Sequence, residues 1–185
     1  TISIKDFADD INQVDEYNVT NYLTAHDSGI KVLAAPNRPE YADLITVDIV
    51  KKVIQLLRKN FDYIVIDAGH GINDIMLEII EDADKLLVVS SLEVSALKNA
   101  QLMVETIIQL KMEEKLELVL NRNNMVSLIK PDEVPNMSRT PKTHYIPNNF
   151  KLASQGMNIG VPVVISNSKS DISKGIFKMA QSILE

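Results

Sequence analysis

Short apolar runs alternate with longer segments of helical periodicity along this chain. Such runs lie at 63–66, 85–89 and 116–120. The first, Tyr-Ile-Val-Ile, is uniformly apolar and mostly β-branched, which is typical of a strand covered on both faces. Between these runs, apolar residues recur every three or four positions, as in an amphipathic helix. Strands that alternate with helices form parallel βαβ units. The pattern therefore predicts an α/β fold, a doubly wound and mainly parallel sheet with helices on both faces.

The same periodicity gives the bounds of the remaining elements. The helices are expected at 3–12, 19–25, 47–57, 73–83, 94–111 and 171–184. A buried strand is expected at 30–35 and a last short strand at 144–146, whereas residues 37–42 are expected to form a loop. Because no repeat, low-complexity tract or long linker interrupts this order, the sequence predicts a single domain over residues 1–185.

The composition excludes several kinds of site. The chain contains no Cys, which rules out a disulfide framework, a thiolate metal site and a cysteine nucleophile. His26, His70 and His144 are far apart and lack the spacing of metal ligands, so we interpret them as solvated or structural. The formal net charge is −6 and no face concentrates basic residues, which disfavours a nucleic-acid partner.

No part of the sequence predicts a membrane-spanning segment or a secretory signal. No apolar run approaches the ~20 residues of a membrane span, and the first residues lack the basic-then-apolar order of a signal peptide. The apolar stripe at 171–184 would suit a membrane-binding helix or core packing, and we interpret it as core packing. A cytoplasmic protein is therefore predicted, with membrane contact at most peripheral.

Asp67 directly follows the first of these apolar runs, with Gly69 and Gly71 behind it. Ligands of open parallel sheets bind beyond the carboxyl ends of the strands. A carboxylate on a strand tip can hold Mg²⁺ through water, and glycines let the backbone approach a phosphate closely. An ordinary Asp at the start of a turn would give the same pattern.

Two further polar segments follow expected strands. The strand at 116–120 ends in Asn121 and Arg122, and an amide can pair with the N6 and N7 edge of adenine. Residues 121–124 are Asn-Arg-Asn-Asn and lack the carboxylate that guanine-specific sites place here, so adenine is favoured over guanine. Pro147 and Asn148 follow the last strand, and the fixed φ of proline could give a flat wall against a base. A polar turn and a proline turn are the plain alternatives.

Taken together, these residues resemble the MinD/ParA family of P-loop ATPases. The resemblance is carried by Phe-Asp-Tyr-Ile-Val-Ile-Asp at 61–67, Asp-Ala-Asp-Lys-Leu-Leu-Val-Val at 82–89, Asn-Arg at 121–122 and Ile-Pro-Asn at 146–148. Further stretches are similar to the CpaE/TadZ branch, which is associated with pilus and secretion machinery. These stretches are Val-Leu-Ala-Ala-Pro at 32–36, Arg-Pro-Glu at 38–40, Ser-Ala-Leu-Lys-Asn-Ala at 95–100, Gly-Val-Pro-Val-Val at 160–164 and Ser-Lys-Ser at 168–170.

The resemblance implies a three-layer P-loop NTPase-like fold that binds ATP and Mg²⁺. By position in the family motif, Asp67 would bind the magnesium ion through water. Gly69 and Gly71 would belong to the switch segment that senses the γ-phosphate. The family also commonly dimerises face to face across nucleotide, so a homodimer is expected.

The resemblance also assigns the base site. Asn121 and Arg122 would contact adenine, and Pro147 and Asn148 would line the base. Membership of the CpaE/TadZ branch would make pilus or secretion-system proteins the partners.

The phosphate loop of this family is missing from the 185 residues. No Gly-rich turn followed by Lys and Thr occurs in the sequence, and without such a loop the β- and γ-phosphates have no cradle. This chain alone is therefore not expected to hydrolyse ATP. We expect it to be the C-terminal part of a MinD/ParA-like domain whose first strand and phosphate loop lie outside the sequence.

Three functions remain to be compared. The first is an ATPase whose cycle drives dimer assembly and release, and the second is a catalytically inactive scaffold of the same fold that recruits pilus components. The third is a response-regulator receiver, which also has an Asp at a strand tip. Receivers are shorter and usually continue with Met-Pro, whereas Ala68 and Gly69 follow Asp67 here, so the receiver is disfavoured.

Overall fold

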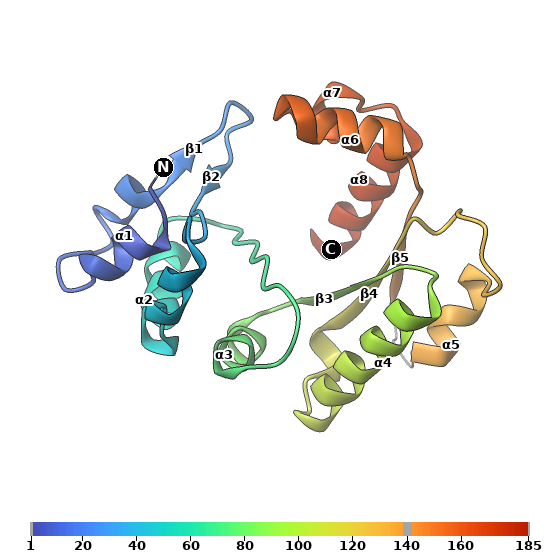
Figure 1. Ribbon diagram of the computed structural model, residues 1–185, viewed down its shortest axis with the longest axis horizontal. Coiled ribbons are helices and arrows are strands. Elements are labelled where there is room, and N and C mark those ends of the chain that lie inside the picture. Colours follow the sequence, from blue (N-terminus) through green and yellow to red (C-terminus); the bar gives the residue numbers. More distant parts are fainter. Residues whose placement is uncertain (1, 139–141, 185) are drawn as a thin grey trace. The chain divides into compact units, whose positions relative to one another are not determined.

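The computed structural model describes residues 2–138 and 142–184. These residues fall into two compact units, Thr1–Asp82 and Ala83–Glu185, and each is described by itself. Figure 1 labels their helices and strands. The single domain expected over residues 1–185 stays a prediction.

The first unit is mainly helical. In chain order its elements are α1 (Ile4–Asp9), η1 (Val19–Tyr22), β1 (Thr24–Ala25), β2 (Lys31–Val32), η2 (Pro39–Leu44), α2 (Val47–Arg58) and α3 (Asp74–Asp82). Helix α1 begins with a capping box, in which Asp6 accepts the N–H of Ser3 at 2.7 Å and the Ser3 hydroxyl accepts the N–H of Lys5. Thr46 caps α2 by accepting the N–H of Ile49 at 3.4 Å.

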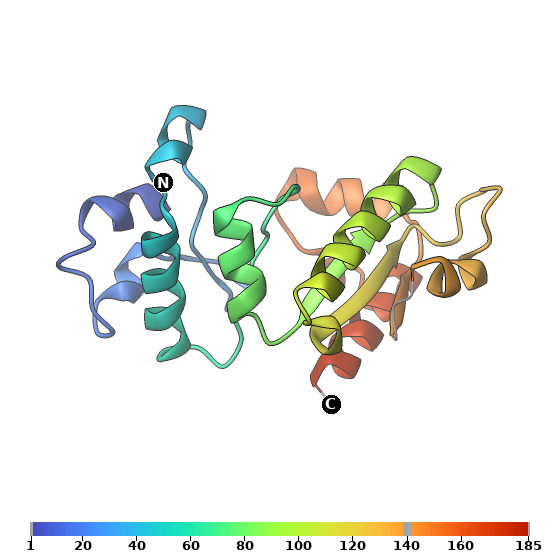
Figure 2. The ribbon, with the colours of Figure 1, turned by 90° about the horizontal axis from the view of Figure 1, so that it is seen from below.

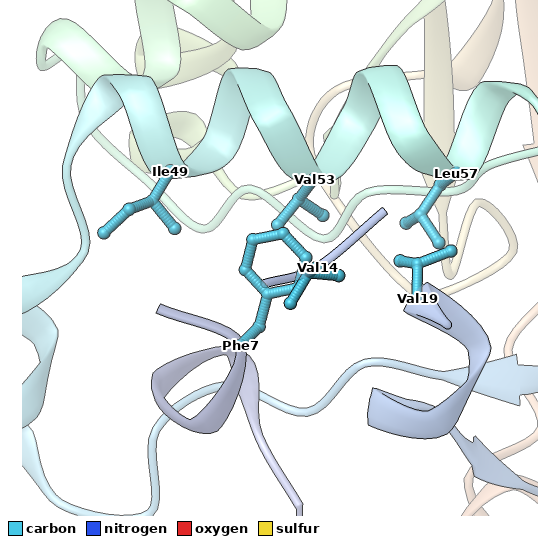
Figure 3. Packing of buried hydrophobic residues seen from close by; sticks show 6 residues of the cluster. All are labelled: Phe7, Val14, Val19, Ile49, Val53 and Leu57. Atoms are coloured by element: carbon cyan, nitrogen blue, oxygen red, sulfur yellow. The ribbon is translucent and has the colours of Figure 1, made fainter. Parts of the chain in front are cut away.

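One apolar cluster forms the core of the first unit, and Figure 3 shows how its side chains meet. The buried members are Phe7, Val14, Val19, Ile49, Val53 and Leu57. The last three lie on one face of α2, at the helical spacing that the sequence predicted. The Phe7 ring has no exposed surface and meets the edge of Tyr22, with ring centroids 5.7 Å apart. The helices expected at 47–57 and 73–83 are confirmed as α2 and α3.

Both strands expected in the first unit are wrong. Residues 63–66 pair with no strand in the described part of the chain, and the side chain of Val65 is 95% exposed. A uniformly apolar strand needs a hydrogen-bonded neighbour and cover on both faces, and within its own unit this segment has neither. Residues 30–35 contribute only the two exposed residues of β2, which pair antiparallel with β1, and an isolated parallel bridge between Ala34 and Ser3.

Two further expectations in this unit need correction. The helix expected at 19–25 is a short 3₁₀ helix, η1, because the chain turns at its end into β1. The loop expected at 37–42 contains the start of another 3₁₀ helix, η2, whose first residue is Pro39. Proline suits the first turn of a helix because its missing N–H would have no partner there.

The second unit contains a parallel sheet. In chain order its elements are β3 (Leu86–Ser90), α4 (Val94–Gln109), η3 (Glu113–Lys115), β4 (Leu116–Asn121), η4 (Pro131–Glu133), α5 (Val134–Ser138), β5 (Thr143–Ile146), α6 (Phe150–Ile159), α7 (Val163–Ser166) and α8 (Asp171–Leu184). The strands pair in the order β3–β4–β5, and both pairings are parallel. All three strands, α4 and α8 were expected, whereas α5, α6 and α7 were not.

Strand β4 lies at the centre of this sheet and is covered on both faces. Leu118 and Leu120 pack with buried residues of α4, and Val119 faces the other side, where it packs with Ile172 of α8. Figures 1 and 2 show the strands between α4 and α8. The predicted α/β fold, with helices on both faces of a parallel sheet, is confirmed.

Helix α8 packs against the sheet through its apolar stripe. Ile172, Ile176 and Met179 lie in one cluster with Val119 and Ile146. These three residues of the stripe expected at 171–184 serve the core, whereas Phe177 and Leu184 are exposed. Among the described helices, none combines the length and the hydrophobicity that crossing a membrane requires.

Candidate functional site

The residues that follow β4 and β5 lie side by side. Asn121, the last residue of β4, pairs with Ile146, the last residue of β5. Beyond the strands, the N–H of Asn123 donates to the carbonyl of Ile146 at 3.2 Å. The N–H of Asn148 donates to Oδ1 of Asn124 at 2.6 Å. The structure therefore brings together the two predicted base-contacting segments at the carboxyl edge of the sheet.

The backbone turns sharply at Asn121 and Arg122, at the end of β4. Arg122 has φ of +56°, a left-handed conformation that costs a non-glycine residue roughly 1–2 kcal/mol. Its N–H donates to Oδ1 of Asn121 at 3.0 Å. Backbone strain of this kind is often kept at functional sites.

The hydrogen bond from the Arg122 N–H uses only one of the two lone pairs of Asn121 Oδ1. An amide oxygen has two lone pairs and an amide nitrogen two hydrogens, and no other described residue bonds to this side chain. Asn121 can therefore still accept from one group and donate to another. That is the combination which the N6–N7 edge of adenine requires.

Pro147 rests on helix α8. Gly175 lies beneath it, and a Cβ added at Gly175 would stand 2.9 Å from Cδ of Pro147 and 3.2 Å from the carbonyl oxygen of Tyr145. Neither Gly175 nor Asn124 was predicted from the sequence as part of this region. A glycine within an otherwise helical apolar stripe, and a third asparagine after a strand, were the signals available.

Asp67, Gly69 and Gly71 belong to the first unit. Asp67 is exposed and forms no hydrogen bond or ion pair with another described residue, and it does not lie at a strand tip because residues 63–66 form no strand. Gly69 has φ of +73° and Gly71 has φ of +87°, so both use the left-handed region that favours glycine. Their roles at a nucleotide stay predictions.

The donor groups fit a base better than they fit phosphates. Among residues 2–138 and 142–184, no three His, Asp or Glu side chains gather in a way that could hold a metal ion. Mg²⁺ at nucleotides usually keeps several waters and uses one or two carboxylates together with phosphates, so Asp67 fits such a site only in the presence of nucleotide. The sequence offers no Lys-containing phosphate loop, and the phosphates therefore have no cradle in this chain.

A buried ionic cluster lies near the amino end of β4, away from Asn121 at its carboxyl end. Oε2 of Glu117 is 2.5 Å from Nε2 of His144, and Oε1 accepts from Nζ of Lys85 at 3.1 Å and of Lys142 at 3.3 Å. Burial raises the pKa of the Glu117 carboxyl, but these three hydrogen bonds outweigh burial and hold the pKa below its ordinary value of 4.5. His144 is thus structural, within the solvated or structural role expected for it, and the cluster links β4 to β5 and to the lysines that directly precede β3 and β5.

Comparison with curated proteins finds two relatives in sequence. The septum site-determining protein MinD of Bacillus subtilis (strain 168) is 34% identical over 73 residues, which are 40% of this chain and 27% of that protein. MinD of Thermotoga maritima is 26% identical over 147 residues, 76% of this chain and 54% of that protein. The chain thus spans about half or less of the length of these relatives. No protein-family model matches it.

Solved structures share the fold over nearly the whole chain. A ParA family ATPase from Chlorobium tepidum TLS superposes with a TM-score of 0.86 at 20% identity, over 98% of this chain and 75% of that one. MinD from Pyrococcus horikoshii OT3, complexed with Mg-ADP, superposes with a TM-score of 0.81 at 18% identity, over 99% of this chain and 73% of that one. A MinC:MinD complex from Aquifex aeolicus superposes with a TM-score of 0.78 at 21% identity, over 100% of this chain and 73% of that one. The chain has the fold of ParA and MinD ATPases, and parts of it are similar in sequence to two MinD proteins.

Proposed function

We propose that this chain is the base-binding part of a MinD/ParA-like ATPase, and that the protein is a nucleotide-dependent dimeric switch. The junction between the segments after β4 and β5 carries the proposal, because it places an available amide beside a proline-containing loop at the carboxyl edge of a parallel sheet. The relative from Pyrococcus horikoshii complexed with Mg-ADP supports the choice of ligand.

The amide of Asn121 would distinguish adenine from guanine. Its Nδ2 would donate to N7 of the base, and its Oδ1 would accept from the N6 amino group of adenine. Guanine carries an oxygen at that position, and two acceptors would then face each other. Arg122 would stack its planar guanidinium on the base, with Pro147 and Asn148 lining the opposite side.

The triphosphate would need residues beyond those of this chain. Asp67 would hold Mg²⁺ through water, and Gly69 and Gly71 would sense the γ-phosphate. A bound Mg²⁺ neutralises charge on the phosphates during transfer. The phosphate loop would have to come from protein sequence outside these residues, so we propose no hydrolysis by this chain alone.

The cellular role rests on resemblance. Residues 32–36, 38–40, 95–100, 160–164 and 168–170 are similar to the CpaE/TadZ branch, and we propose that the protein localises or assembles pilus or secretion machinery from the cytoplasm. A homodimer formed across nucleotide would be the active state. The MinC:MinD complex from Aquifex aeolicus, a structural neighbour, supports protein partners in general.

A nucleotide-independent scaffold is the second candidate. One observation favours it: Asp67 lies in a segment that forms no strand in the described residues, so the proposed magnesium ligand is not held on a rigid strand tip. A scaffold would dimerise and recruit partners without nucleotide.

Equilibrium binding distinguishes the two candidates. The full-length protein would be titrated in Mg²⁺ with ADP and GDP that carry a fluorescent group on the ribose. We expect tighter binding of the adenine probe, and Asn121→Ala should weaken it about tenfold and abolish the preference for adenine. Asn158→Ala, at an exposed position of α6, is the control and should bind like the wild type.

Sedimentation velocity completes the test. The proposed switch should form a dimer with ATP and remain a monomer without it. A wild-type protein that binds neither probe and dimerises without nucleotide would support the scaffold instead.

A further inference from the structure

We infer that Asn124 and Gly175 are positioning residues of the base site, which hold the Pro147–Asn148 segment in place against the end of β4. The inference rests on the proposed function. It extends that proposal to two residues that would not touch the nucleotide themselves.

Asn124 fixes the segment from the side of β4. Proline has no N–H, so Pro147 interrupts the hydrogen bonding at the end of β5, and the next available donor is the N–H of Asn148. That N–H donates to Oδ1 of Asn124 at 2.6 Å. Together with the bond from Asn123 to Ile146 at 3.2 Å, it continues the contact between the segments after β4 and β5 beyond the sheet.

Gly175 supports the same segment from below. A Cβ at this position would lie 2.9 Å from Cδ of Pro147, 3.2 Å from the Tyr145 carbonyl oxygen and 3.5 Å from Cα of Ile146. Two of these neighbours are backbone atoms, which cannot move aside as a flexible side chain can. Glycine in a helix interior is unfavourable relative to alanine, so its presence in α8 is explained by this close approach.

The two contacts converge on the residues that would line the base. Asn124 accepts a hydrogen bond from the backbone of Asn148. The absence of a side chain at Gly175 determines how closely Pro147 can approach helix α8. Displacement of either residue would change the gap between the proline wall and the Asn121 amide. Hydrogen bonds weaken steeply as their angle departs from linearity, so both affinity and the choice of base should respond.

The test uses the full-length protein with Mg²⁺ and ribose-labelled fluorescent ADP and GDP as probes. Asn124→Ala should weaken ADP binding about three- to tenfold and reduce the ratio of ADP to GDP affinity. Asn124→Asp keeps an acceptor oxygen at the same place and should retain the ratio. Gly175→Ala should weaken ADP binding as well, although alanine favours the helix.

Amide exchange provides a readout that does not depend on nucleotide. In NMR spectra of the free protein, the Asn148 N–H should exchange faster with solvent in Asn124→Ala than in the wild type. The control Asn158→Ala should leave both exchange and nucleotide affinity unchanged.

The outcomes separate the inference from the proposed function. If the wild type prefers the adenine probe while Asn124→Ala and Gly175→Ala bind as it does, the inference is overturned and the proposed function stands. If the wild type binds neither probe, the proposed function fails and the inference falls with it. Weaker, less selective binding by Asn124→Ala together with retained selectivity in Asn124→Asp supports the inference.

Discussion

Replacing Glu117 by alanine should destabilise the second unit by about 3 kcal/mol. Glu117 is 3% exposed, and its carboxylate accepts from His144, Lys85 and Lys142. Truncating one partner of a buried ionic group usually costs roughly 3–5 kcal/mol. The low end applies because the lysine side chains are 44% and 39% exposed and can turn to water. The His144 side chain is only 7% exposed and cannot turn to water, so it would lose its partner.

The assay is urea unfolding followed by far-ultraviolet circular dichroism, at neutral pH and in acid. Hydrogen bonds hold the pKa of Glu117 in the folded state below its ordinary value of 4.5. Its contribution is therefore fully present above that value and is lost as the pH falls through the folded-state pKa. The stability difference between the wild type and Glu117→Ala should shrink accordingly in acid.

Glu114→Ala is the matched control. Glu114 is an exposed glutamate in η3, just before β4, and its replacement should change the stability by no more than about 0.5 kcal/mol. Equal stabilities of Glu117→Ala and Glu114→Ala at neutral pH would refute the reasoning about the buried cluster.

Three further substitutions test the packing and the helix ends by urea or thermal unfolding. Leu118→Ala, at a side chain with no exposed surface, should cost about 3 kcal/mol, whereas Leu128→Ala, at a fully exposed one, should cost less than about 0.5 kcal/mol; equal costs would contradict the assigned core. Gly156→Ala should cost about 2 kcal/mol, because the added Cβ would lie 2.8 Å from the backbone oxygen of Val161, and an unchanged midpoint would count against this contact. Thr46→Ala should lose about 1 kcal/mol of capping, and Thr46→Ser should restore it if the hydroxyl is responsible.

Local patterns predicted much of the second unit. The mostly apolar residues of β4 indicated a buried strand, and the structure buries Leu116 through Leu120. Glu117 lies within that run, and only the folded sheet shows why a charge is tolerated there. Its partner His144 comes from β5 and its partner Lys85 directly precedes β3, and such pairing cannot be obtained from periodicity.

The strand predicted at residues 63–66 is wrong for a similar reason, because pairing between strands is not encoded locally. Their composition matches that of β4, yet a strand depends on a hydrogen-bonded neighbour that the local sequence does not specify. The helix α6 was missed for another reason, since Phe150 and Met157 on it are exposed and give no stripe that faces a core.

The candidate site was predicted in outline. The sequence indicated that Asn121 and Pro147 each follow a strand, and the structure adds that these two strands are neighbours whose ends meet. The bond from Asn148 to Asn124 was not predictable, because it depends on the conformation of both loops. The position of Asp67 relative to a nucleotide stays a prediction.

Photocrosslinking tests the central claim, a base site at the ends of β4 and β5, most directly. The full-length protein would be irradiated with an azidoadenine nucleotide and Mg²⁺, and the labelled peptides would be mapped by mass spectrometry. The account predicts label in the segments around Asn121–Asn124 and Pro147–Asn148. Excess ADP present during irradiation should prevent this labelling, and excess GDP should prevent it less well. Label confined to other segments, or label that ADP does not displace, would contradict the account.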